Sequence, residues 1–308
     1  MNMDALLEFI ERHERIYLYG AGAKGALLAD ALQAKDVKVS GFVVTRRKKE
    51  QMRFLGLPLL ELHELRDIDA DDSGFVYTLD SRFHAEVTEG LMAAGFKNFF
   101  RIPDVFFREL GEEAGRLTVQ DILSVWPAPE VDYLQPVSWR RILLLRLDGI
   151  GDVVLFTPFL RALRRAHPES EITLIVQPMV YNLMEACPYI DHLLVYDWHE
   201  DSGAPLRARC RHAREYVQEH GLAGQYDIVL NSRWDSDYYD AGALAYFTEA
   251  PCRVAWSEHV LPSKAKQNCG YDEFYTMTLL DKRICHEVEH NLQFLTRLGI
   301  KVLGEKSL

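Results

Sequence analysis

The 308-residue chain is poor in cysteine and lacks a long apolar segment, and each absence excludes a class of protein. Its five cysteines are odd in number and none forms a CxxC pair, which argues against a disulfide framework and against a zinc site. No apolar run reaches the length of a membrane span, and the first 20 residues carry acidic side chains where a signal peptide needs basic ones. We therefore expect a cytoplasmic protein with reduced thiols, at most in peripheral contact with the inner membrane face.

Basic residues are also fewer than acidic ones. The chain has 46 acidic against 35 basic residues, a formal net charge of −11, and the acidic residues are spread along its length. This balance gives no support to nucleic-acid binding and indicates mainly solubility. One basic run, Arg46 to Lys49, is more typical of a solvated loop than of a phosphate contact.

The chain does contain two series of alternating strands and helices, which predict parallel sheets with helices on their faces. Three prolines between Pro127 and Pro136 interrupt the alternation. We predict an α/β fold of two Rossmann-like parallel-sheet domains, residues 1–126 and 140–308, with a linker at 127–139.

The expected elements follow from apolar runs and helical periodicity. In the first half, we expect strands near residues 16–20, 37–44, 75–79 and 98–102, and helices near 23–33, 83–94 and 118–125. In the second half, we expect strands near 141–147, 171–176, 192–197, 226–231 and 252–256, and helices from about Asp152 to Ala166 and near 180–186, 205–220, 240–247 and 286–299.

A glycine motif, GAGAKG, directly follows the first predicted strand and opens the first predicted helix. In that context a GxGxxG pattern predicts a phosphate site, because Gly20, Gly22 and Gly25 let a phosphate approach backbone N–H groups at a helix N-terminus. Lys24 adds a cation nearby. The equally weighted alternative is a turn that serves close packing of strand and helix and binds nothing.

The second predicted strand lacks the acidic residue that holds the ribose of NAD, since Thr45 and two arginines follow it. NAD is therefore disfavoured, and NADP is only weakly allowed. The stretch from Ile16 to Ile102 is similar to the small Rossmann-like domains found at the amino-terminal end of bacterial sugar-modifying enzymes. In acetyltransferases of that kind the domain binds a nucleotide sugar, so the resemblance implies a nucleotide or nucleotide-sugar ligand.

The most informative segment runs from Arg141 to Pro168, RILLLRLDGIGDVVLFTPFLRALRRAHP. It predicts a buried strand, a tight glycine loop and an amphipathic helix. Two aspartates, Asp148 and Asp152, lie in or next to that loop. A carboxylate at a loop tip suits a general base. For Asp152 the alternative is a helix N-cap that accepts hydrogen bonds from first-turn amides.

This segment resembles the family 9 glycosyltransferases, the ADP-heptose:lipopolysaccharide heptosyltransferases. The resemblance implies that Asp152 is the catalytic base, that Asp148 binds the acceptor and is the fallback base, and that Arg146 orients an acidic acceptor. It further implies a metal-independent inverting displacement. The donor substrate would be a nucleotide-diphosphate sugar, with no other cofactor.

A second segment of the resemblance, YDIVLNSRWDSDYYD, holds candidates for acceptor binding. These are Arg233, Asp235 and Asp237, which follow a predicted strand. Arginine recognises phosphate or carboxylate through two parallel hydrogen bonds, which fits an anionic sugar. The alternative is a charged loop with tyrosines packed beneath it.

Residues 286–290, HEVEH, match the HExxH zinc motif. A third ligand is missing, and family members carry a related HxVERNL segment at this place, so we favour an incidental helix face over a metal site.

The resemblance covers about Arg140 to Gly299, the acceptor half of a GT-B glycosyltransferase. The donor half would follow the final helix, yet the sequence ends at Leu308. Three explanations stay open: the first domain binds the donor, a separate chain supplies the donor half, or the chain is a truncated or inactive relative. Two functions follow: a glycosyltransferase of heptosyltransferase type acting on lipopolysaccharide or another glycan, or a noncatalytic protein that binds a nucleotide sugar or a glycan.

Overall fold

The computed structural model describes residues 3–47, 52–128, 139–197 and 204–302. Its contacts divide the chain into two compact units: residues 1–117 with 199–212, and residues 118–198 with 213–308. The sequence predicts a boundary at the prolines between residues 127 and 139, of which 129–138 lie outside the described residues. The contacts divide the chain earlier because the helix at 119–125 packs in the second unit, next to the turn at Tyr271–Phe274.

In the described residues of the first unit, a six-stranded sheet has the order β3-β4-β2-β1-β5-β6. All neighbours are parallel except the short hairpin of β3 and β4. Its strands are β1 (Arg15–Tyr19), β2 (Gly41–Val44), β3 (Arg53–Phe54), β4 (Leu57–Glu61), β5 (Ser73–Tyr77) and β6 (Phe99–Arg101).

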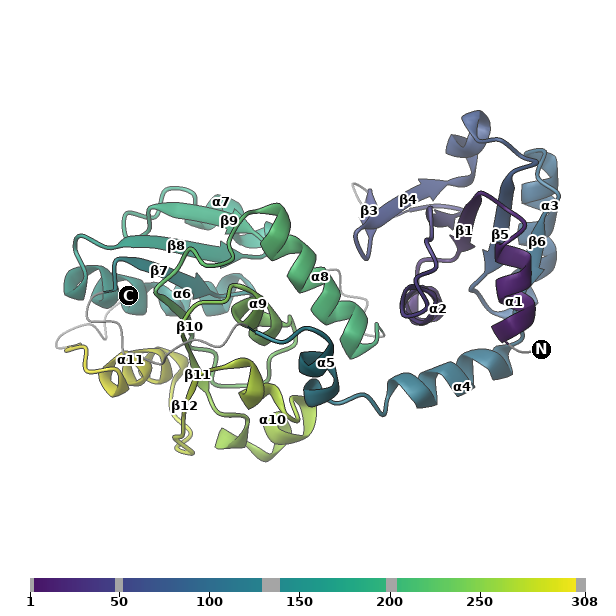
Figure 1. Ribbon diagram of the computed structural model, residues 1–308. Helices are drawn as coiled ribbons and strands as arrows, with labels where there is room; N and C mark the ends of the chain where they lie inside the picture. Colours follow the sequence, from purple (N-terminus) through teal and green to yellow (C-terminus); the bar gives the residue numbers. More distant parts are fainter. Residues whose placement is uncertain (1–2, 48–51, 129–138, 198–203, 303–308) are drawn as a thin grey trace. The chain divides into compact units, whose positions relative to one another are not determined.

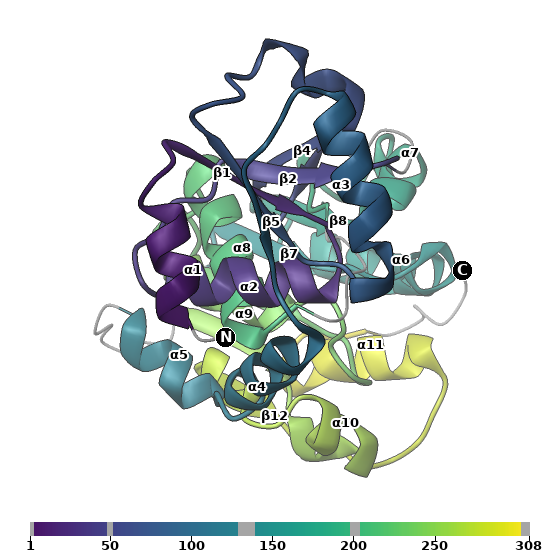
Figure 2. The same cartoon turned by 90° about the vertical axis from the view of Figure 1, so that its right-hand side faces the viewer.

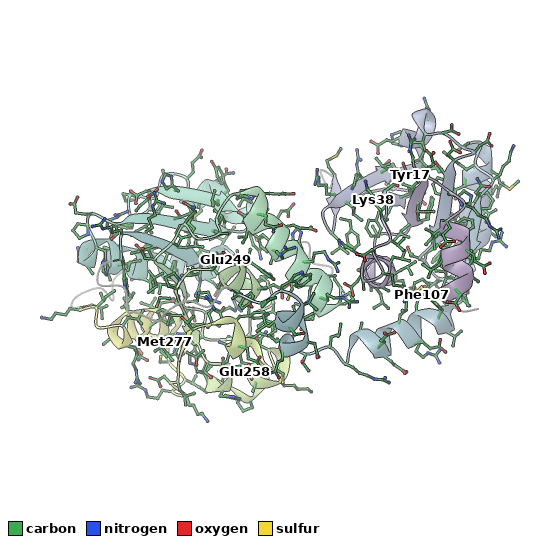
Figure 3. All side chains as sticks on the ribbon, in the orientation of Figure 1. Tyr17, Lys38, Phe107, Glu249, Glu258 and Met277 are labelled. Carbon is green, nitrogen blue, oxygen red and sulfur yellow. The ribbon has the colours of Figure 1, made fainter. Side chains whose placement is uncertain are left out.

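Helices cover both faces of this first sheet. Figure 2 shows α1 (Met3–Ile10) and α3 (His84–Ala93) on opposite sides of β1 and β5. On one face α1, α2 (Ala23–Gln33) and α4 (Asp104–Ala114) bury a core that includes Phe107, and on the other α3 buries a core that includes Tyr17; both residues are labelled in Figure 3. Alternate residues of one strand thus serve opposite cores, as the period of a strand requires.

The described residues of the second unit form a six-stranded, fully parallel sheet of order β12-β11-β10-β7-β8-β9 (Figure 1). The strands are β7 (Arg141–Leu145), β8 (Glu171–Val176), β9 (His192–Val195), β10 (Ile228–Asn231), β11 (Cys252–Trp256) and β12 (Met277–Leu279). Counted along the chain, this is the 3-2-1-4-5-6 order of a doubly wound Rossmann fold. The predicted α/β class with two mostly parallel sheets is confirmed.

Two helices cover one face of the second sheet. The helices α6 (Ile150–Ala166) and α11 (Glu287–Arg297) pack against each other, and their apolar residues join those of the strands in a single core. Helix α9 (Ala241–Phe247) packs on β10. The remaining helices are α5 (Val119–Val125), α7 (Tyr181–Met184), α8 (Leu206–Glu219) and α10 (Pro262–Gln267).

The strand order determines where a ligand site is expected. In the second sheet the direction of winding reverses between β7 and β10, which are hydrogen-bonded neighbours. In open α/β sheets, ligands bind outside the carboxyl ends of the strands at such a reversal. A ligand site is therefore expected at the loops after β7 and β10, which carry Arg146, Asp148 and Arg233.

Candidate active site

Arg146 begins the loop that follows β7, and its side chain is buried, with 1% of its surface exposed. Its Nε atom lies 2.7 Å from a carboxylate oxygen of Asp148, and an Nη atom lies 2.7 Å from Oε1 of Glu287. The guanidinium also lies over the ring of Phe156, 5.2 Å from the ring centre. A buried arginine held by two carboxylates and an aromatic face is fixed in one orientation.

Arg233 joins Arg146, Asp148 and Glu287 from the loop after β10. We call these four residues the charged cluster. Its guanidinium contacts the second carboxylate oxygen of Asp148, so that Asp148 lies between two arginines. Its Nε donates a hydrogen bond of 2.5 Å to the carbonyl oxygen of Ser236. Burial, with a smaller contribution from the charge of Arg146, lowers the pKa of Arg233. Arginine side chains stay protonated in proteins, so the group remains a cation.

Helix α11 supports the cluster through a set of buried hydrogen bonds. Asn291, which is fully buried, accepts a 2.7 Å hydrogen bond from the hydroxyl of Ser232. Its amide donates to Glu287 Oε1 at 3.3 Å, and Arg146 donates to its carbonyl oxygen at 3.4 Å. Glu287, Asn291 and Ser232 are site residues that reasoning from the sequence missed. For Glu287 and Asn291, the sequence feature that could have indicated a shared role is their four-residue spacing, which places both on one face of a helix.

The HExxH residues make three different sets of contacts. His286 caps α11 by accepting a hydrogen bond from the backbone N–H of Val288, and Glu287 holds Arg146. His290 is buried and stacks on the ring of Trp234 at 4.0 Å, and burial lowers its pKa. In the described part of the chain, no three His, Cys, Asp or Glu side chains are grouped closely enough to hold a metal ion.

Asp152 lies next to the charged cluster but is not part of it. Gly149 is the N-cap of α6, which makes Asp152 the third residue of the helix. The alternative role of Asp152 as the N-cap is therefore wrong. Its side chain is half-buried, and among the described residues its carboxylate has no hydrogen-bond or ion-pair partner. A carboxylate free of backbone amides keeps its lone pairs available to accept a proton.

The structure separates the two acidic residues that we predicted to bind the acceptor together with Arg233. The buried carboxylate of Asp237 accepts hydrogen bonds from the N–H groups of Tyr239, Ala241 and Gly242, at 3.0, 3.2 and 2.9 Å. It stabilises the start of α9 and has little capacity left for a ligand, so we do not retain it in the acceptor site. Asp235 is exposed, and one of its oxygens accepts from the neighbouring backbone N–H of Ser236 at 2.6 Å.

The glycine loop of the first unit lies at the equivalent reversal of winding, between β1 and β5. Gly20 has a φ of +119°, which only glycine adopts without strain, and its carbonyl accepts a 2.7 Å hydrogen bond from the hydroxyl of Thr78. A Cβ atom on Gly22 would meet nothing within 4 Å, so the backbone there is open to a ligand. Lys24 is paired with Asp80 at 2.5 Å and with Asp104 at 2.6 Å, so its charge is already balanced.

Two substitutions in this loop should differ sharply in stability. A Cβ atom on Gly25 would lie 2.2 Å from the backbone oxygen of Gly20, so Gly25→Ala should lower the free energy of unfolding by about 1–3 kcal/mol or more. The matched control Gly22→Ala should stay within about 0.5 kcal/mol of the parent. Urea unfolding followed by circular dichroism compares the two variants, and equal midpoints would contradict the close packing of Gly25 on Gly20.

Three known proteins are similar to parts of this chain. A curated protein of Haemophilus influenzae named "Putative glycosyltransferase" is 33% identical over 56 residues, 18% of this chain and 16% of its own. A solved family 9 glycosyl transferase from Veillonella parvula is 27% identical, with a TM-score of 0.43, over 55% of this chain and 44% of its own. The E. coli heptosyltransferase WaaC, solved with ADP, is 16% identical, with a TM-score of 0.41, over 53% of this chain and 48% of its own.

The chain resembles the family 9 glycosyltransferases. The similarity to the solved family 9 glycosyl transferase extends over about half of the chain. The chain spans less than half the length of the solved proteins named above. No protein-family model matches it. Among the described residues, no helix is both long and apolar enough to cross a membrane.

Proposed function

We propose that this chain is a glycosyltransferase of heptosyltransferase type, which transfers a sugar from a nucleoside-diphosphate sugar to a glycan acceptor such as lipopolysaccharide. The observation that carries the proposal is the unpartnered carboxylate of Asp152 beside the charged cluster of Arg146, Asp148, Arg233 and Glu287, among the described residues. Arg146, Asp148 and Arg233 lie in the loops at the carboxyl ends of the neighbouring strands β7 and β10, where ligands of this fold bind, and Asp152 lies in the first turn of the helix that follows the β7 loop.

In the proposed reaction, Asp152 takes the proton of an acceptor hydroxyl as its oxygen attacks the anomeric carbon. The new bond between that oxygen and the anomeric carbon forms while the bond to the phosphate oxygen breaks. The nucleoside diphosphate leaves with the electron pair, and a single displacement inverts the configuration. The proposed donor is an ADP-sugar, since ADP is the nucleotide with which WaaC was solved.

Arg233 would orient the acceptor. Its guanidinium is half-buried and already held by Asp148, so little conformational entropy is lost when it binds an anionic sugar. Arg146, with 1% of its surface exposed, would act through Asp148 without touching the acceptor, so we do not retain it as an acceptor-binding residue. Asp148 is enclosed by the two arginines, with 1% of its surface exposed, which makes it a structural counter-ion and a poor candidate for the fallback base.

The glycine loop supports a second part of the proposal, in which the first unit binds a nucleotide or nucleotide sugar through Gly20, Gly22 and Gly25. The open backbone at Gly22 favours this role. The two aspartates on Lys24 oppose a large contribution from its ammonium to phosphate binding.

A transfer assay tests the proposal. The chain is incubated with ADP-heptose and a lipopolysaccharide-type acceptor, with UDP-glucose and NADPH as comparison ligands. We expect a product heavier by one sugar in mass spectrometry, and NMR should show inverted anomeric configuration. Calorimetric binding of donor or acceptor without any product would instead favour the noncatalytic binding protein.

A further inference from the structure

Side chains from one side of the short helix α10 form hydrogen bonds with the loop that carries Arg233. Lys264 lies within α10 and Asn268 is its C-cap, and the spacing of four residues places both on the same side of the helix end. Both side chains are buried, with 5% and 1% of their surface exposed. Neither belongs to the charged cluster, and neither was singled out by the sequence.

Lys264 holds the first part of the loop. Its ammonium group donates to the carbonyl oxygens of Arg233 and Trp234, both at 3.2 Å, and to that of Trp256 at 3.0 Å. These three bonds use every N–H donor of the group. A buried ammonium bound only by carbonyls is costly to keep charged, and burial lowers the pKa of Lys264 to about 8. The buried ammonium of Lys264 therefore contributes little to folding stability, but it fixes the three backbone carbonyls to which it donates.

Asn268 holds the other end of the same loop. Its side-chain amide donates to the carbonyl oxygen of Asp237 at 2.7 Å, and its own carbonyl accepts from the N–H of Asp237 at 2.7 Å. Both backbone groups of one residue are thus paired, as they would be in a sheet. The strand β10 ends at Asn231, so the backbone beyond it needs other partners.

We propose that Lys264 and Asn268 are positioning residues for acceptor recognition, because they fix the loop 233–237 that aims Arg233 at Asp148. This inference rests on the proposed function, in which Arg233 binds an anionic acceptor. Recognition by a planar guanidinium needs the group within about 0.5 Å and 10–20° of its productive position. A loop anchored at both ends by one rigid helix face meets that demand.

The test uses the full chain with Lys264→Met and Asn268→Ala. The matched control is Lys266→Met, which removes an exposed lysine from the same helix. Hydrogen exchange measured by mass spectrometry reports the order of peptides within 232–242, and calorimetry reports affinity for glucose 6-phosphate as an anionic sugar probe. We expect both variants to exchange about tenfold faster in 232–242 and to bind the probe about tenfold more weakly, with Lys266→Met unchanged.

A pH series separates positioning by the charge from simple packing. The charged groups around the Lys264 ammonium are Asp235 and Asp237 in the loop, Asp272 in the turn at Tyr271–Phe274, and Arg233. Above about pH 8 the amine loses a proton and one of its three donors, so the wild-type affinity should fall between pH 7 and 9.5, whereas Lys264→Met should give a flat profile. The folded pKa lies below the unfolded value, so the same rise in pH increases the free energy of unfolding, and weaker binding there cannot be attributed to unfolding.

The outcomes are distinguishable. Unchanged exchange and unchanged affinity in both variants would overturn the inference. Should Lys264→Met fail to fold, Asn268→Ala decides alone. If the wild type does not bind glucose 6-phosphate or any other anionic sugar, the proposed acceptor site fails, whereas faster exchange of 232–242 would still support the anchoring role of α10.

Discussion

Asp152→Asn should reduce the rate of sugar transfer by about 10²- to 10⁴-fold, the usual contribution of a general base. The amide has nearly the same shape as the carboxylate but cannot take the proton of the acceptor hydroxyl. Its stability should match the wild type within about 0.5 kcal/mol, because among the described residues the carboxylate has no partner to lose. Release of the nucleoside diphosphate and appearance of product give the rate, and thermal unfolding gives the stability.

The control for this substitution is Glu171→Gln. Glu171 is the first residue of β8, so it lies at the opposite end of the strands from the loops that hold the cluster. Its carboxylate is exposed. This variant should retain full activity. Equal turnover in Asp152→Asn and the wild type would remove Asp152 from the mechanism.

Asp148→Asn should lower the free energy of unfolding of the second unit by about 3–5 kcal/mol. The substitution removes the carboxylate that lies between Arg146 and Arg233, and the buried guanidinium of Arg146 and the half-buried one of Arg233 then face each other without it. Urea unfolding followed by tryptophan fluorescence measures the effect in this unit alone, because all five tryptophans of the chain lie within it.

Asp235→Asn is the matched control for Asp148→Asn. It removes an exposed carboxylate from the loop that also carries Arg233, and its stability should change by less than about 0.5 kcal/mol. Equal stability of the two variants would show that the buried contacts of Asp148 contribute nothing.

Much of the fold could be predicted because periodic and apolar segments dominate the two sheets. The predicted helix at 23–33 has the bounds of α2, and the predicted strands at 171–176 and 252–256 have those of β8 and β11. In these segments, local periodicity and tertiary packing demand the same structure, so the sequence pattern alone is sufficient.

The missed elements have specific causes. Strand β4 contains Pro58, and a proline usually argues against a strand. Here Pro58 is tolerated because it lies opposite Arg53 of the two-residue edge strand β3 on one side and beside Gly41 on the other. The helix α4 begins after Pro103 and buries Phe106, Phe107 and Leu110 on one face, a helical spacing that the sequence already contains, so no physical conflict explains why this helix was missed.

The candidate site was predicted only where the residues are close in sequence. Arg146, Asp148 and Asp152 lie within one loop and helix start, so the motif revealed them together. The partners of Arg146 on α11, Glu287 and Asn291, lie about 140 residues further along the chain, and the packing of α11 against α6 brings them near. No local pattern in a single sequence encodes such a contact.

The charged cluster also determines how the site would respond to salt. Two guanidiniums and two carboxylates cancel within the cluster, but the carboxylates of Asp152 and the exposed Asp235 leave the site with a net negative charge. Capture of an anionic sugar would then depend on short hydrogen bonds formed after contact and not on long-range attraction. Salt, which screens charges beyond a Debye length of about 8 Å in physiological buffer, would weaken the repulsion and should not slow the encounter.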